Sequence, residues 1–171
     1  FPHDETATRI ELLRGLVSDS LTRDRLAHRA SELRQREGDY EGFLRLAREC
    51  RDSEFPQLAC WAACAEAFYA GAHTDAGLRF LSLANRILDA TPTDDPGRSL
   101  MRVRILVAET FGHIWAGNVQ ASAPGFAELA DAEDPGPRAM GLQGLAMLQI
   151  LDEDSRGALA TLESVPDMVH F

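Results

Sequence analysis

The chain has 171 residues, of which 45% are hydrophobic, enough for a folded domain with a sizeable core and too many for a disordered chain. Its formal net charge is −10, so nucleic acid and anionic membrane surfaces would repel it, and we expect no direct nucleic-acid binding through this domain. Neither an uncharged apolar run of about 18 residues nor a basic-then-apolar leader is present, so we expect no membrane span and no secretion, but a soluble cytoplasmic protein. Because the first residue is Phe1 and not Met, we expect residues 1–171 to be a single domain from a longer protein.

The spacing of apolar residues predicts helices along the whole chain and no strand. Such residues recur at every third or fourth position, and no alternating run rich in β-branched residues is present. The first helix is expected at about residues 6–18. A second helix ends at Gly38, and Asp39 caps a third that begins at Tyr40.

Three further helix pairs follow in the sequence. They are expected at residues 58–70 and 75–90, at 99–116 and 121–132, and at 138–151 and 155–163. Thr74 is the expected cap of helix 75–90. Together with the earlier pair, their hinges fall near Gly38, Ala72, Gly117 and Glu153, at intervals of roughly 34 to 45 residues. Because a single helix pair leaves one apolar side uncovered, this repeat predicts that neighbouring pairs stack on one another.

Large and small apolar residues stand at set intervals between Cys60 and Pro92. Before the hinge these are Trp61, Cys64, Ala65 and Phe68, and after it Gly77, Leu81 and Ala84, with Pro92 at the close. This order resembles the tetratricopeptide repeat (TPR), and the similarity extends, less closely, over about residues 21–165. The resemblance implies an all-α fold, a right-handed superhelix of antiparallel helix hairpins, with about four pairs behind one N-terminal helix.

In TPR proteins the first helix of each pair lines a concave surface, so the resemblance implies a binding groove. The candidate groove residues are Arg25, His28, Arg36, Tyr69, Arg104, Phe111, Ile114, Trp115, Met140 and Met147, and Glu66 falls on the same face. The later candidates are apolar. If exposed, they would be covered by a protein or peptide, by a small apolar ligand, or by a second copy in a homodimer. The alternative is that helix 99–116 is central and buried on both faces.

The resemblance implies an interaction module and not an enzyme. Similar repeat regions occur in large bacterial ATP-dependent transcription regulators of the LuxR type, where they sense inducers or hold the regulator inactive. All 17 basic residues are arginine and alanine is abundant, which indicates a GC-rich bacterial genome. We therefore expect the sensor region of such a regulator. The alternative is an all-helical small-molecule-binding protein or enzyme with a closed pocket near His113 and Glu109.

No residue pattern indicates catalysis, a metal or a cofactor. The five histidines are scattered, and the phosphate-binding and nucleophile-elbow patterns are absent. We expect Cys50, Cys60 and Cys64 to be small core residues, although Cys60 and Cys64 share a helical face where they would suit oxidation or metal binding. We expect no catalytic residue, no metal and no cofactor.

Overall fold

The computed structural model describes residues 2–71 and 73–165. Within these ranges the chain forms nine α-helices, one 3₁₀ helix and no strand, which confirms the predicted all-α class. The elements are α1 (Pro2–Arg14), α2 (Ser20–Arg36), α3 (Tyr40–Cys50), α4 (Pro56–Ala70), α5 (Asp75–Ala90), α6 (Arg98–Trp115), the 3₁₀ helix η1 (Val119–Ser122), α7 (Ala123–Ala130), α8 (Pro135–Leu151) and α9 (Ser155–Glu163). None of these helices has the length and apolar character needed to cross a bilayer.

Side chains predicted to cap helices do so. Asp39 accepts a hydrogen bond from the Gly42 amide at 2.9 Å, and Thr74 Oγ1 accepts one from the Gly77 amide at 3.0 Å. Several boundaries differ from prediction. The first helix spans Pro2–Arg14 and not about 6–18, and Asp19 already caps α2. Helix α8 begins at Pro135 and not at 138, and the helix predicted at 121–132 is split into η1 and the short α7.

The backbone turns sharply at the predicted hinges. Gly38, Gly71 and Gly117 have φ values of 78°, 82° and 75°, a left-handed conformation that glycine adopts without steric cost. Glu153 has a φ of 63° at the fourth hinge, where a side chain is strained. The hinge predicted near Ala72 lies outside the described residues, directly after Gly71.

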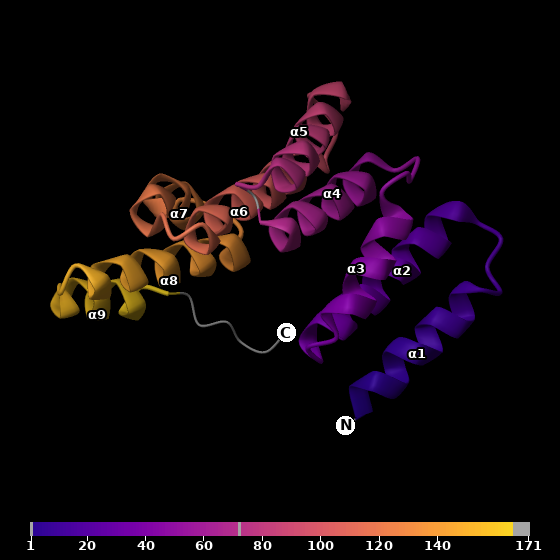
Figure 1. Cartoon of the computed structure of the whole chain (residues 1–171), viewed down its shortest axis with the longest axis horizontal. Coiled ribbons are helices and arrows are strands. Elements are labelled where there is room, and N and C mark those ends of the chain that lie inside the picture. The colour runs from indigo at the N-terminus through magenta and orange to yellow at the C-terminus, as the bar shows by residue number, and fades with distance from the viewer. Residues whose placement is uncertain (1, 72, 166–171) are drawn as a thin grey trace.

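The helices pack as sequential pairs that follow one another along an arc, with α1 at one end and α9 at the other (Figure 1). Helix α2 packs on α3, α4 on α5, and α8 on α9, while α1 covers α2. Helix α7 is an exception, because it packs mainly on α8 and less on its predicted partner α6. The paired helices therefore build the molecule step by step along the chain.

The core consists of three apolar clusters in chain order. The first lies among α2, α3 and α4, the second among α4, α5 and α6, and the third among α6, α7 and α8. Helix α4 belongs to two of them: Trp61 and Ala65 face α2 and α3, whereas Cys60, Cys64 and Ala67 face α5 and α6. This is possible because nearly every residue of α4 is apolar and most are small, so that helices approach it on two sides.

Helix α8 lies directly against the backbone of α7. A Cβ atom on Gly141 would lie 2.2 Å from the backbone nitrogen of Ala130, and one on Gly144 would lie 2.2 Å from the Phe126 ring. Both glycines are buried. Glycine at these positions therefore allows the backbone of α8 to rest directly on α7.

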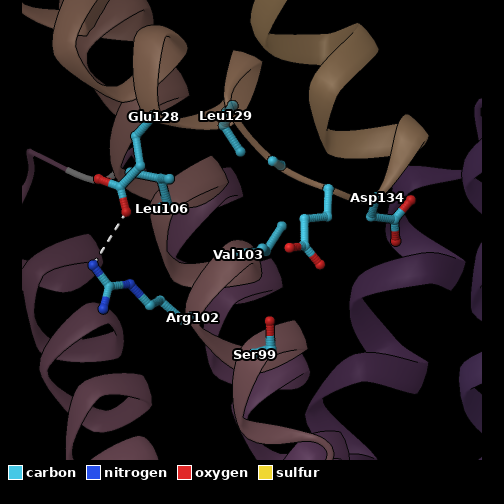
Figure 2. A pocket seen from close by; sticks show the side chains of 9 residues that line it. Ser99, Arg102, Val103, Leu106, Glu128, Leu129 and Asp134 are labelled. Carbon is cyan, nitrogen blue, oxygen red and sulfur yellow. Dashed lines mark hydrogen bonds and ion pairs between the residues drawn. The ribbon is translucent and has the colours of Figure 1, made fainter. Parts of the chain in front are cut away.

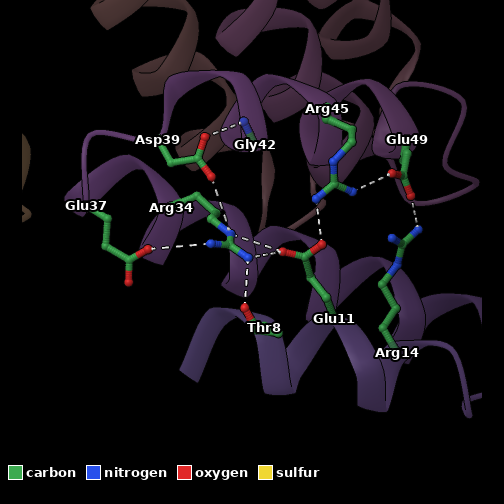
Figure 3. Close-up of polar contacts among 9 residues, drawn as sticks. All are labelled: Thr8, Glu11, Arg14, Arg34, Glu37, Asp39, Gly42, Arg45 and Glu49. Carbon is green, nitrogen blue, oxygen red and sulfur yellow. Dashed lines mark hydrogen bonds and ion pairs between the residues drawn. The ribbon is translucent and has the colours of Figure 1, made fainter. Parts of the chain in front are cut away.

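A network of charged side chains holds α1 against α2 and α3 (Figure 3). The Glu11 carboxylate accepts hydrogen bonds from Arg34 of α2 and Arg45 of α3, and Arg14 pairs with Glu49 of α3. Burial raises the pKa of Glu11, but the hydrogen bonds from Arg45 and Arg34 outweigh it and leave that pKa below its ordinary value. Polar contacts thus supplement a modest apolar interface at this end of the arc.

Candidate functional site

A hollow of about 560 Å³ opens on the side of the molecule where α2, α4, α6 and α8 meet. We call it the central groove. Its principal walls are Trp61 and Phe68 of α4, Arg104 and Phe111 of α6, and Met140 of α8. Trp61 and Phe68 are seven positions apart in the sequence, about two helical turns, and so are Arg104 and Phe111. Each of the two helices therefore presents one face to the groove.

Aromatic rings continue from this groove towards the C-terminal ends of α4 and α6. The Phe68 ring lies 6.0 Å from that of Phe111 and 6.1 Å from that of Trp115, and the Tyr69 ring lies 5.3 Å from that of Phe43, measured between centroids. Phe68 and Tyr69 also line an adjoining hollow of about 650 Å³, which Trp115 lines as well. Trp115 is 67% exposed. The two hollows therefore form one aromatic-lined surface.

Arg104 stands at the other end of the central groove. Its Nη1 donates a hydrogen bond to the Gln57 carbonyl oxygen at 3.1 Å, and its Nη2 lies 3.4 Å from Nε2 of His28. It also lines a side hollow of about 360 Å³, together with Arg25. Arg104 is thus accessible from two sides.

His28 positions Arg104 against the aromatic wall. Its ring makes an edge-on contact with Trp61 at a centroid distance of 4.4 Å. Burial, together with the charge of Arg104, lowers the pKa of His28 below its ordinary value. A neutral His28 accepts a hydrogen bond from Arg104 through Nε2 and adds no charge of its own.

The structure brings together six of the ten candidate residues predicted from sequence around the central groove and its two neighbouring hollows. They are Arg25, Tyr69, Arg104, Phe111, Trp115 and Met140, and His28 contacts two of the groove residues from behind. The other three lie elsewhere. Ile114 and Met147 pack against the third core cluster, and Arg36 is exposed outside the lining of these hollows.

Glu66, also predicted on the inner face, points the other way. Its carboxylate is buried and pairs with Arg48 at 3.3 Å and Arg51 at 3.4 Å. It follows Trp61 by five positions, which turns it roughly 140° around the helix from the groove side. The prediction that Glu66 faces the groove was therefore wrong, because its position in the helical turn directs it towards α3 and the residues that follow α3.

Groove residues that the sequence reasoning missed include Phe43, Trp61, Phe68 and Pro137. The sequence pattern of the repeat predicts Phe43, Trp61 and Phe68 only as packing positions. A large ring can fill the space between two helices and still present an edge to a hollow beside them. The spacing of Trp61 and Phe68, two helical turns apart, was the available signal.

A separate hollow of about 360 Å³ lies between α6 and the segment that joins α7 to α8 (Figure 2). Val103 and Leu129 contribute apolar walls, but its rim is charged, and Arg102 pairs with Glu128 at 3.2 Å. Asp134 caps α8 through the Gly136 amide. These groups are engaged with one another or with the backbone, so we do not treat this hollow as the site.

The residues weighed for chemistry are placed as follows. Cys50, Cys60 and Cys64 are buried and free, as expected of core residues. The His113 ring lies 4.2 Å from that of His73, and within the described residues no hydrogen bond joins it to Glu109. Residues 2–71 and 73–165 contain no group of three or more His, Cys, Asp or Glu side chains placed to hold a metal ion.

No protein-family model, no curated protein and no solved structure matches this chain. The resemblance to TPR proteins therefore stays a prediction from its own residues.

Proposed function

We propose that this chain is a binding module whose central groove receives the apolar part of a small ligand or of a peptide. The observation that carries the proposal is the groove itself, an aromatic-lined hollow of about 560 Å³ in a protein with a net charge of −10. Ligand pockets typically measure about 300–1,000 Å³ and are lined mainly by apolar side chains with a few polar groups. The adjoining exposed Trp115 would extend such a contact.

We further propose that the helix pairs form a TPR-like, right-handed superhelix of four hairpins behind α1. Three features support this. The pairs are sequential, their hinges recur, and the core clusters follow one another along the chain. In addition, most of the groove lining comes from α2, α4, α6 and α8, the first helix of each pair, which is the face that TPR proteins use.

The place of the module in a larger protein is proposed by analogy. In LuxR-type ATP-dependent regulators, similar repeats sense inducers, so a groove-bound ligand would act as the signal. A ligand that binds one arrangement of the helix pairs better than another would shift the regulator between active and inactive states.

The proposed function is tested with 1-octanol, a neutral ligand whose chain fits the groove. Both tryptophans, Trp61 and Trp115, line the surface formed by the two hollows, so binding should change the intrinsic fluorescence. Burial of an eight-carbon chain predicts a Kd on the order of 0.1–1 mM after the costs of association.

Two variants locate the binding. Met140→Asp places a carboxylate in the groove at a residue exposed enough to spare the fold, and it should weaken octanol binding about tenfold. Leu78→Asp makes the same kind of change on an exposed residue of α5, outside these hollows, and should have no effect. If octanol leaves the fluorescence unchanged, or if both variants weaken binding equally, the groove is not the binding site.

A further inference from the structure

We infer that the central groove takes a small amphipathic carboxylate, with the apolar body along the aromatic wall and one acid group at Arg104. This inference rests on the proposed function, because it names the class of ligand that the groove would hold.

The distribution of charge is the first argument. The chain has 27 acidic residues and 17 arginines, yet among the described residues Arg104 is the one charged residue in the lining of the central groove. In the same part of the chain, the side hollow adds Arg25 and no carboxylate, and the hollow next to Trp115 has no charged residue in its lining. In a protein of net charge −10, the lining of this surface therefore carries positive charge at one end and no acidic group among its described residues, which is complementary to an anion.

The state of Arg104 is the second argument. Two of its five N–H groups are accounted for by Gln57 and His28, and within residues 2–71 and 73–165 no carboxylate forms an ion pair with it. The nearby Glu32 is held by Arg29 at 2.8 Å. Burial lowers the pKa of the Arg104 guanidinium, and the weaker attraction of Cys60, Cys64 and Glu32 offsets only part of this effect. A partly buried cation without a counter-ion is unfavourable, and a bound carboxylate would supply one.

Comparison with the other partly buried arginines supports this interpretation. Arg14, Arg34 and Arg51 pair with Glu49, Glu11 and Glu66, so for these three the chain supplies the acid itself. Arg98 has no acid partner and donates to the carbonyl oxygens of Leu88 and Thr91, outside the groove. Among the described residues, Arg104 is the partly buried arginine that lines the groove with no acid paired to it. The remaining N–H groups of its guanidinium suit the two oxygens of a carboxylate.

The size and charge of the site indicate a small monoanion. His28, whose pKa is lowered, is neutral beside Arg104, and Arg25 lines only the side hollow, so Arg104 brings a single positive charge into the groove itself, whereas a phosphate dianion is normally held by several cationic or N–H groups. A volume of about 560 Å³ falls in the range of small-molecule pockets.

The test compares octanoate with 1-octanol and octylammonium, which share the chain and differ in charge, by tryptophan fluorescence and calorimetry. Octanoate should bind the wild-type chain about tenfold more tightly than octanol, since a hydrogen bond to a charged group contributes this much after desolvation. Octylammonium should bind more weakly than octanol. Arg104→Gln should remove the preference for octanoate and leave octanol binding unchanged, whereas Arg104→Lys should keep part of it.

Arg102→Gln is the matched control. It removes the same charge from the same helix, but Arg102 forms an exposed pair with Glu128 away from the groove, so the preference for octanoate should remain. Circular dichroism checks that each variant is folded. If octanoate and octanol bind equally, or if Arg104→Gln keeps the preference, the inference fails while the groove remains a binding site. If none of the three ligands binds, the proposed function fails as well.

Discussion

Gly141 tests directly how α8 packs on α7. A Cβ atom there would lie 2.2 Å from the nitrogen of Ala130, 2.6 Å from the carbonyl carbon of Leu129 and 2.7 Å from the carbonyl oxygen of Phe126. All three are backbone atoms, which cannot rotate away as a side chain can. For Gly141→Ala, the two helices would have to separate by roughly 1 Å to restore ordinary contact.

Overpacking of this kind costs about 1–3 kcal/mol, although alanine favours a helix over glycine by up to about 1 kcal/mol. We therefore expect Gly141→Ala to lower the free energy of unfolding by about 1–2 kcal/mol and the melting temperature by roughly 2–8 °C. Urea titration and thermal melts followed by circular dichroism measure both quantities.

Gly136→Ala on the same helix is the control. A Cβ atom at Gly136 would meet one atom, Asp134 Oδ1, at an ordinary distance of 3.5 Å. This variant should be about as stable as the wild type, because the helix preference of alanine is opposed by Pro137, which disfavours a helical residue with a Cβ directly before it. If Gly141→Ala is equally stable, α8 does not rest on the backbone of α7 as described.

Three further predictions concern single side chains. Because burial lowers the pKa of His28 below 6.5, the unfolded chain binds that proton more readily, and stability is lost as the pH falls through about 6.5. In the wild-type chain the free energy of unfolding should fall between about pH 7.5 and 5.5, and in His28→Gln this fall should be smaller by up to roughly 1 kcal/mol. An equal fall in the two proteins would contradict this prediction. Burial raises the pKa of Cys50 to about 12, and Cys60 and Cys64 are also buried, so a thiol reagent such as DTNB should label no cysteine in the folded chain and all three after denaturation. Labelling of even one thiol before unfolding would refute it. Glu153→Gly should stabilise the chain by up to about 1 kcal/mol in the same urea titrations, because it relieves the strain of a positive φ; a loss of stability would show that Glu153 makes a contact of its own.

The helices were largely predictable because their signals are local. Asp39 and Thr74 cap helices through amides three residues ahead, and the Gly38 and Gly117 hinges follow from the conformational freedom of glycine. The main error in pairing concerned α7, predicted with α6 but packed chiefly on α8. Glycines at 141 and 144 cause this, because they let the two backbones approach, and no local rule states which helix will use such a surface.

The site was less predictable than the fold. Helix α4 is apolar on nearly every side, so periodicity does not indicate which face meets the groove, and Glu66 was assigned to the wrong one. The positions of Ile114 and Met147 depend on how α7 and α8 pack against α6, which is a long-range property. Both side chains are therefore part of the third cluster instead of the groove.

The sequence by itself determined that this chain is helical, where most helices begin and end, and that they follow in pairs, because capping, glycine hinges and apolar periodicity act over a few residues. Only the tertiary structure decided which rings border the groove and that Arg104 lines it without a carboxylate paired to it among the described residues. That outcome depends on the side chains that distant helices bring together: Arg104 of α6 meets Gln57 and His28 from two other helices, and each of the nearest acids already has a partner or lies outside the groove.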